Sequence, residues 1–102
     1  MIHVVAIITA LHGQRDAVLA EFRSIMPLVR QERGCIQYSP VVDVADSPEA
    51  IARIGPDAFM VIEQWADRAA VDAHAASAHM AAYAGRVKGL LASRVIYALQ
   101  EV

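Results

Sequence analysis

The chain has 102 residues, of which 57% are hydrophobic and 20% are charged, and its formal net charge is -2. This length allows one domain, which we expect to span residues 1–102. The hydrophobic content excludes a disordered chain, and the slightly acidic balance argues against a nucleic-acid partner or a polybasic membrane anchor.

The first half of the chain is expected to form a strand, a helix and a second strand. Residues 2–11 are mostly β-branched and apolar on both faces, which predicts a strand buried on both sides. Residues 14–32 carry one apolar stripe at helical spacing, and Pro27 should kink or divide this helix. The stripe consists of Val18, Phe22, Ile25 and Val29. Residues 35–44 have strand character with Pro40 in the middle, which is typical of an edge strand or a bulge.

A loop and a third strand follow. Residues 45–57 contain several turn-forming residues, and we expect a loop in which Ser47 caps a single helical turn. Residues 58–66 alternate as in a strand, so that Glu63 and Trp65 share one face.

The remaining residues complete an α+β domain. Asp67 is expected to cap a helix that ends near residue 76, and Ser77 a second one that ends at Leu90 or Leu91. Residues 93–101 alternate as a final strand. The order β-α-β-β-α-β predicts a ferredoxin-like fold, with a four-stranded antiparallel sheet and helices on one of its faces.

The other face of such a sheet would expose a row of apolar side chains. Packing against the same face of a second copy would bury them, so we expect a homodimer that forms a dimeric α+β barrel. The N-terminus lacks the basic region of a signal peptide, and no apolar run is long enough to span a membrane. We therefore expect a cytoplasmic protein without a membrane partner.

The sequence predicts no cofactor and no metal. The five glycines are scattered and form no phosphate-binding loop. Cys35 is the only cysteine, and no Cys/His cluster has the spacing of a zinc site.

Glu63 is the most unusual residue, because it is a carboxylate in the middle of an apolar strand. Burying it as a charge is costly, so it must be paired, protonated or hydrated. It is either the partner of an arginine such as Arg94 or an acid or base in a cavity. Trp65 on the same face either fills the core or forms a wall of an aromatic-ligand pocket, with its indole N–H free to orient a ligand.

His74 and His79 are candidate proton acceptors, with ordinary helix-surface positions as the alternative. On one continuous helix their spacing of five would place them about 140° apart, which is poor for a shared metal. If Ser77 divides the segment, His74 lies near a helix C-terminus and His79 in the first turn of the next helix. Tyr38, Tyr83 and Tyr97 are further candidates for contact with a phenolic substrate, with core packing as the alternative for each, and Phe22 is also expected to contact the substrate.

Two segments resemble the antibiotic biosynthesis monooxygenase family. Glu63-Gln64-Trp65, followed by His74, Ser77 and His79, resembles its E-x-W…H…S-x-H segment. Residues 27–38 resemble its helix-end stretch E-P-G-C-x-x-Y, with Arg33 in place of the proline. The resemblance covers nearly the whole chain.

The resemblance implies a dimeric α+β barrel with a pocket between sheet and helices, and oxidation of phenolic substrates by O2 without a cofactor. It implies His74, with His79 second, as the group that handles the proton, Trp65 as a pocket wall or hydrogen-bond donor, and Glu63 as a residue that orients a histidine or takes part in proton transfer. We expect His74, Glu63 and Trp65 to be catalytic, with substrate contacts from Tyr38, His79, Tyr83 and Phe22. Haem-degrading relatives have an asparagine where this chain has Ala6, which argues against haem. The loop at 45–57 is longer than is usual in the family, so the mouth of the pocket should differ.

The sequence therefore leads to a cofactor-independent monooxygenase that oxidises a small phenolic, quinol or polyketide-like substrate with O2. Two alternatives remain at this point. One is a non-catalytic dimeric module that binds a small aromatic molecule, since a fold does not fix a function. The other is an isomerase of a small carbonyl compound that uses Glu63 and a histidine as acid and base.

Overall fold

The computed structural model describes all residues 1–102, and it has the predicted α+β architecture. In chain order the elements are β1 (Ile2–Ala10), α1 (Arg15–Arg30), β2 (Cys35–Val41), β3 (Ala58–Trp65), α2 (Arg68–Ala75), α3 (Ala78–Val87), the 3-10 turn η1 (Lys88–Leu90) and β4 (Leu91–Leu99). The strands form one antiparallel sheet in the order β2-β3-β1-β4. No helix is long and apolar enough to cross a membrane.

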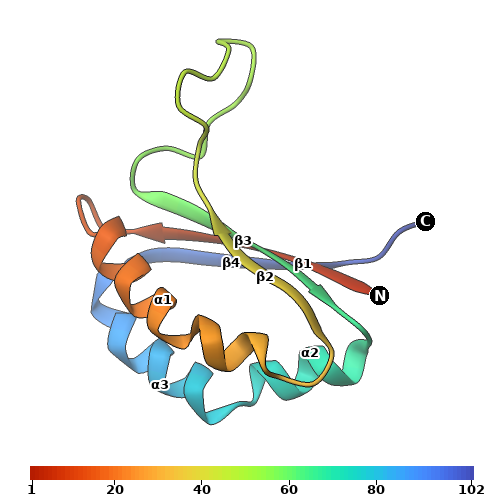
Figure 1. Cartoon of the computed structure of the whole chain (residues 1–102). Coiled ribbons are helices and arrows are strands. Elements are labelled where there is room, and N and C mark those ends of the chain that lie inside the picture. The colour runs from red at the N-terminus through yellow and green to blue at the C-terminus, as the bar shows by residue number, and fades with distance from the viewer.

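All three helices lie on one side of the sheet, and the other face is bare (Figure 1). The central strand β1 shows this asymmetry, because Val4, Ala6 and Ile8 are buried while Val5 and Ile7 are only half-buried. The expectation that this strand is buried on both sides is therefore wrong for a single copy of the chain. Its second apolar face has no helix to cover it.

Phe22 joins the helical layer to the sheet. Its ring stacks on Tyr38 of β2, with centroids 5.1 Å apart, and meets the edges of Phe59 of β3 at 5.6 Å and Tyr83 of α3 at 6.0 Å. Such offset and edge-to-face pairs add stability beyond the area they bury. The helical stripe predicted from the sequence is the buried face of α1, as expected.

Both predicted helix caps are present. The side chain of Asp67 accepts a hydrogen bond from the Ala70 amide at 2.8 Å and begins α2, and Ser77 Oγ accepts one from the Met80 amide at 3.4 Å and begins α3. The segment is thus two helices with a break at Ser77. The second helix ends at Val87, a few residues earlier than predicted, because the chain continues as the turn η1.

The prediction for Pro27, that it kinks or divides its helix, and the prediction for Pro40, that it lies in an edge strand or a bulge, have different results. Pro27 lies inside α1 but does not divide it, so the helix continues despite losing the one hydrogen bond that proline cannot donate. Pro40 lies in β2, which is an edge strand of the sheet, as predicted.

Residues 42–57 form an arm that projects from the sheet on the side opposite the helices (Figure 1). The carboxylate of Asp43 closes its base by accepting hydrogen bonds from the amides of Ile54 at 3.0 Å and Gly55 at 2.9 Å, and these bonds lower the pKa of Asp43. A single turn forms at the predicted place, because the Ile51 amide donates to the Pro48 carbonyl at 3.0 Å, but it does not continue as a helix. Ser47 does not cap this turn and instead donates its hydroxyl to the Val44 carbonyl.

Gly34 makes the tightest approach between the two helical segments. Its φ is +81°, and a Cβ at this position would lie 2.7 Å from the Cβ of Ala70 on α2. Its carbonyl accepts a hydrogen bond from the Ala66 amide at 2.8 Å. The turn after α1 therefore needs glycine both for its left-handed backbone and for its contact with α2.

We expect Gly34→Ala to lower the free energy of unfolding by about 1–3 kcal/mol, because it adds backbone strain and a clash at once. Urea denaturation followed by circular dichroism measures this. Gly85→Ala is the matched control, since Gly85 lies in helix α3 and a Cβ there meets nothing within 4 Å. The control should be neutral or stabilising by up to about 1 kcal/mol. Equal stability of Gly34→Ala and wild type would contradict this account of the turn.

Candidate functional site

A pocket of about 620 Å³ lies between the sheet and the helices. Of its 21 lining residues 16 are hydrophobic, so it is an apolar pocket with a few polar groups, as is typical of small-molecule sites. The polar and charged groups of its lining are Tyr38, Glu63, His74, Tyr83, Lys88 and Arg94. None of the arm lines it, so the expectation that the longer loop alters the mouth of the pocket is not met in this single chain.

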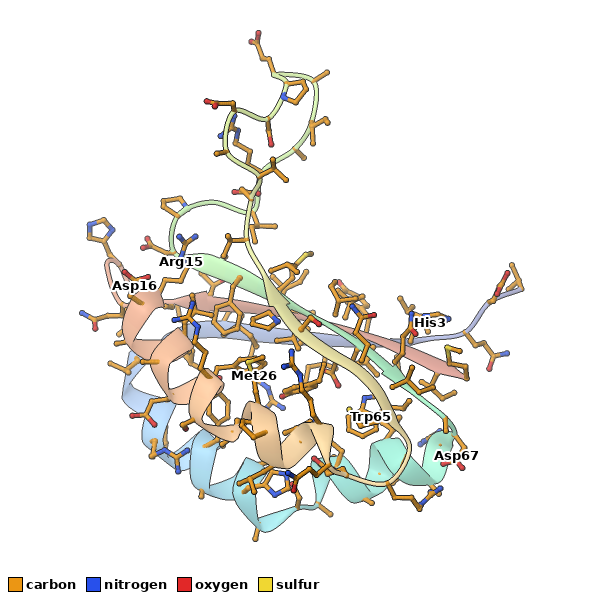
Figure 2. All side chains as sticks on the ribbon, viewed as in Figure 1. His3, Arg15, Asp16, Met26, Trp65 and Asp67 are labelled. Carbon is orange, nitrogen blue, oxygen red and sulfur yellow. The ribbon has the colours of Figure 1, made fainter.

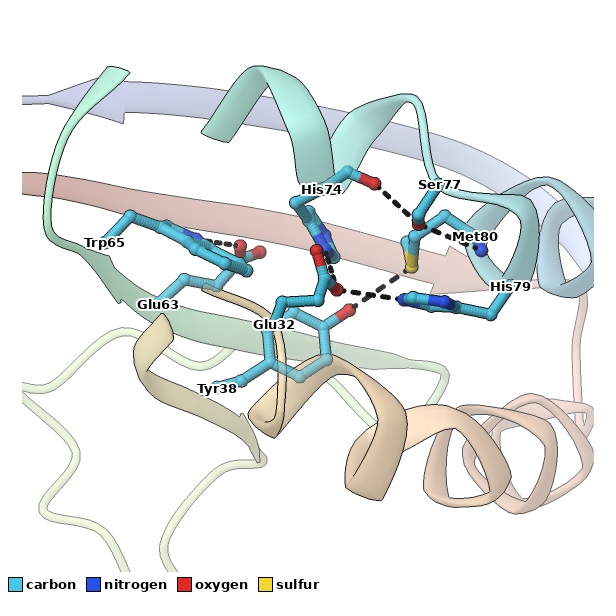
Figure 3. A network of polar contacts seen from close by, with 8 residues as sticks. All are labelled: Glu32, Tyr38, Glu63, Trp65, His74, Ser77, His79 and Met80. Carbon is cyan, nitrogen blue, oxygen red and sulfur yellow. Dashed lines mark hydrogen bonds and ion pairs between the residues drawn. The ribbon is translucent and has the colours of Figure 1, made fainter. Parts of the chain in front are cut away.

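Glu63 enters the pocket from β3 and is 6% exposed. One of its oxygens accepts a hydrogen bond from the Trp65 indole N–H at 2.9 Å (Figure 3). The other oxygen accepts no hydrogen bond, yet no buried polar side-chain atom lacks a partner, so this oxygen is reachable from the pocket. Burial raises the pKa of the carboxyl, and the bond from Trp65 and the proximity of His74 oppose that rise.

The alternative role of Glu63, an ion pair with Arg94, is not formed. Arg94 lies opposite Ile8 on β4, so that its side chain is on the helix side of the sheet, where it also lines the pocket. It is close enough to lower the pKa of the Glu63 carboxyl, but the hydrogen bond to Glu63 comes from Trp65.

Trp65 does not form a pocket wall, which corrects the prediction from the sequence. Its side chain lies beside α2 (Figure 2). It is completely buried and is absent from the pocket lining. Its N–H is not free for a ligand, because it is donated to Glu63. The indole can act on the pocket only through Glu63 and through His74, whose ring centroid lies 4.7 Å away.

His74 projects from α2 into the pocket lining and is 8% exposed. Its ring lies against two aromatic side chains, with centroids 4.7 Å from Trp65 and 5.4 Å from Tyr38. Its Nδ1 lies 2.9 Å from Oε2 of Glu32, a residue in the turn after α1. Its Nε2 has no hydrogen-bond partner, and since no buried polar atom is left unpaired, that nitrogen is open.

Glu32 connects the two histidines, and sequence reasoning did not identify it as a site residue. The same oxygen, Oε2, lies 2.9 Å from Nε2 of His79 (Figure 3). The break at Ser77 brings both rings to this one carboxylate, which the spacing argument for a continuous helix did not anticipate. The three donor atoms lie within 4.8 Å of one another and are of types that bind transition metals. In this structure the two histidine nitrogens are already paired by their hydrogen bonds to Glu32 Oε2.

The two tyrosines of the pocket remain phenols. Burial raises the pKa of Tyr83 to about 12 and raises that of Tyr38 further. Tyr38 directs its hydroxyl at the sulfur of Met80, 3.9 Å away, which is a weak interaction (Figure 3). Both hydroxyls can therefore donate to an oxygen of a bound molecule at neutral pH.

The structure thus brings five of the eight predicted site residues to one pocket. These are Phe22, Tyr38, Glu63, His74 and Tyr83. Tyr97 instead lies on the bare face of the sheet, opposite Val5 of β1. Trp65 and His79 lie outside the lining, each one hydrogen bond away from a residue of the network.

Comparison with known proteins identifies the family and the fold. The family model for antibiotic biosynthesis monooxygenase matches residues 1–86. The probable quinol monooxygenase YgiN of Escherichia coli K12 is 42% identical over 91 residues, which cover 87% of this chain and 86% of that protein. The crystal structure of PA3566 from Pseudomonas aeruginosa has a TM-score of 0.80 at 31% identity, covering 99% of this chain and 93% of its own. A crystal structure described as an antibiotic biosynthesis monooxygenase has a TM-score of 0.81 at 28% identity, covering 100% and 99%.

The raised pKa of Glu63 predicts the effect of Glu63→Gln on stability. The folded protein holds this proton more tightly than the unfolded chain, whose carboxyl has a pKa of about 4.3. The contribution of Glu63 to stability is therefore complete below that value and is lost as the pH rises through the folded pKa. Glutamine keeps the acceptor for Trp65 and removes the buried charge.

We expect Glu63→Gln to be more stable than wild type at neutral pH, where burial disfavours the ionised form of Glu63. Near pH 4, which is about the pKa of the carboxyl in the unfolded chain, we expect the two proteins to be equally stable. Urea denaturation at the two pH values measures the difference. A variant that is less stable than wild type at neutral pH would show that the charged form is the one that the fold favours.

Proposed function

The chain belongs to the antibiotic biosynthesis monooxygenase family and is a monooxygenase, and from this premise we propose that it oxidises a small quinol or related phenol with O2. The name of the E. coli relative, probable quinol monooxygenase, supports a quinol as the substrate. The observation that carries the proposal is the pocket itself. It is apolar, large enough for one or two fused rings, and has an open carboxylate oxygen and an open imidazole nitrogen among its few polar atoms.

The first step that these residues can perform is removal of a phenolic proton. His74 is the acceptor in this proposal, because its Nε2 is unpartnered and open while Nδ1 is occupied by Glu32. A positioned histidine typically contributes about 100- to 10,000-fold as a general base. Glu63 lines the same pocket from the sheet side and can accept a hydrogen bond from a second hydroxyl of the substrate through its free oxygen.

The remaining chemistry belongs to the substrate. A quinol anion is electron-rich and can reduce O2, so the protein has to hold the anion and keep water away. In a monooxygenation one oxygen atom enters the ring and the other leaves as water, and the quinol supplies all four electrons. The hydroxyls of Tyr38 and Tyr83 are suited to hold the oxygens of the anion, because burial keeps both of them protonated.

We also propose that two copies associate through the bare face of the sheet. The β4 side chains on this face are large and exposed: Val95 by 43%, Tyr97 by 50% and Leu99 by 48%. They lie beside the half-buried Val5 and Ile7 of β1. Together they form a continuous apolar surface of the kind that marks a protein interface.

Oxygen consumption tests the proposed reaction. Chelator-treated protein should consume O2 above the rate of autoxidation with at least one member of a panel of hydroquinones, naphthohydroquinones, catechols and anthrones. We expect His74→Gln to lower kcat/KM by about 100-fold or more, because it removes the proton acceptor. Trp65→Phe should lower it by about 10- to 150-fold, because Glu63 loses a hydrogen bond of about 1.5–3 kcal/mol to its charged form.

His12→Gln is the matched control, since His12 is exposed in the turn after β1 and hydrogen-bonds only Asp57 there. It should leave the rate unchanged. Absence of O2 uptake with every compound would contradict the monooxygenase chemistry proposed for this pocket. Product analysis would then distinguish an isomerase, which converts its ligand, from a binding module, which does not.

Tyr97→Glu tests the association. We expect this variant to elute as a monomer in size-exclusion chromatography with light scattering, where wild type elutes as a dimer, because a carboxylate would be buried unpaired in the interface. Leu28→Glu is the matched control on the helical side, where Leu28 is 51% exposed. A monomeric wild type, or a dimer that Tyr97→Glu leaves intact, would contradict the proposed interface.

A further inference from the structure

Glu32 is the one charged group of the network that lies outside the pocket and yet contacts a residue that lines it. Its side chain is only 14% exposed, and it sits in the turn between α1 and β2, 42 residues before His74. The turn is fixed by Gly34, whose contact with Ala70 places it against α2. On α2, Ala70 and His74 are four residues apart and therefore face the same side.

We propose that Glu32 is a positioning residue that holds His74 in a single tautomer, with hydrogen on Nδ1 and a bare Nε2 toward the pocket. An ionised carboxylate only accepts hydrogen bonds, so a neutral His74 at 2.9 Å must carry its hydrogen on Nδ1. Nε2 is then the proton acceptor. The catalytic consequence of this role rests on the proposed function. The tautomer itself can be observed without any substrate.

His79 orients the carboxylate. It approaches the same oxygen from α3 and must donate through Nε2–H, which makes it the opposite tautomer from His74. Its side chain is 24% exposed and does not line the pocket. His79 therefore fixes where Glu32 points, while Glu32 fixes which nitrogen of His74 is bare.

The rings around His74 restrict its plane but cannot choose its tautomer. Trp65 and Tyr38 contact its faces and edges, and neither hydrogen-bonds to it. Glu63 on β3 is a further ionisable group near His74, and no hydrogen bond joins the two, because the hydrogen bond to Glu63 comes from Trp65. The choice of tautomer therefore depends on Glu32 alone.

Glu32→Gln separates this role from a structural one. The amide has nearly the shape of the carboxylate, but one of its two polar atoms donates. It can bond a His74 with bare Nδ1 as well as one with Nδ1–H, so the variant should contain both tautomers. The expected result is a fall in kcat of about tenfold to 100-fold with a small change in KM, a part of the general-base contribution.

Nitrogen-labelled histidine rings, measured in a long-range proton–nitrogen correlation spectrum, test the tautomer directly. The signals of His74 are those absent from His74→Gln. In wild type we expect a protonated Nδ1 and an unprotonated Nε2 at neutral pH, and in Glu32→Gln we expect both nitrogens to shift toward intermediate values. Glu32→Asp keeps an acceptor-only group and should retain the wild-type tautomer.

Two variants serve as controls. His79→Ala also removes one hydrogen bond from Glu32, but it should leave the tautomer of His74 unchanged. Glu21→Gln removes the carboxylate charge from another tie between α1 and α3, the 2.7 Å hydrogen bond from Arg86, and should change neither the spectrum nor kcat. If Glu32→Gln only lowers the melting temperature, as a structural tie would, the proposal is wrong.

The proposal is also overturned if wild-type His74 carries its hydrogen on Nε2, or if Glu32→Gln leaves the His74 spectrum unchanged. Failure of the proposed function has a different signature. In that case no quinol is turned over by wild type, while the spectra still report the predicted tautomer and its dependence on Glu32.

Discussion

One carboxylate oxygen, Oε2 of Glu32, ties the end of α1 to both helices that follow β3. That contact depends on two local features of the sequence. Gly34 allows the turn after α1 to press against α2, and Ser77 breaks the helical segment so that His74 and His79 reach the same atom. A continuous helix would direct the two rings to different sides. The pocket wall at His74 is thus positioned by a turn and a helix break that are far apart in the sequence.

The pocket combines an apolar lining with polar atoms that are either paired or open to it. Burial acts in the same direction on every acid in the lining, because it disfavours the charged form: it raises the pKa of Glu63, Tyr38 and Tyr83. Two phenols and a carboxyl group whose ionised form is disfavoured by burial therefore surround the space where an aromatic anion would lie. The two phenols stay protonated, so they add no negative charge and can donate hydrogen bonds to such an anion.

The fold follows from patterns that are local in the sequence, and the site does so only in part. The stripe of α1, the alternation of β3 and the caps Asp67 and Ser77 each predict their element, because each depends on neighbours within a few residues. Glu63 was identifiable as a charge in an apolar strand. Glu32 was not, since a glutamate at a helix end is ordinary and its two partners lie 42 and 47 residues away. The burial of Trp65 likewise depends on how α2 packs, which periodicity does not determine.

The last strand links the pocket to the bare face of the sheet. Successive side chains of a strand point to opposite faces, so in β4 Arg94 and Ile96 line the pocket while Val95 and Tyr97 face outward. This strand is at the edge of the sheet and is paired only with β1. Anything that packs against Val95 and Tyr97 would therefore also restrict the strand that carries Arg94 and Ile96. The proposed association through the bare face would therefore act on the pocket through the backbone of β4, without any pocket residue touching the second copy.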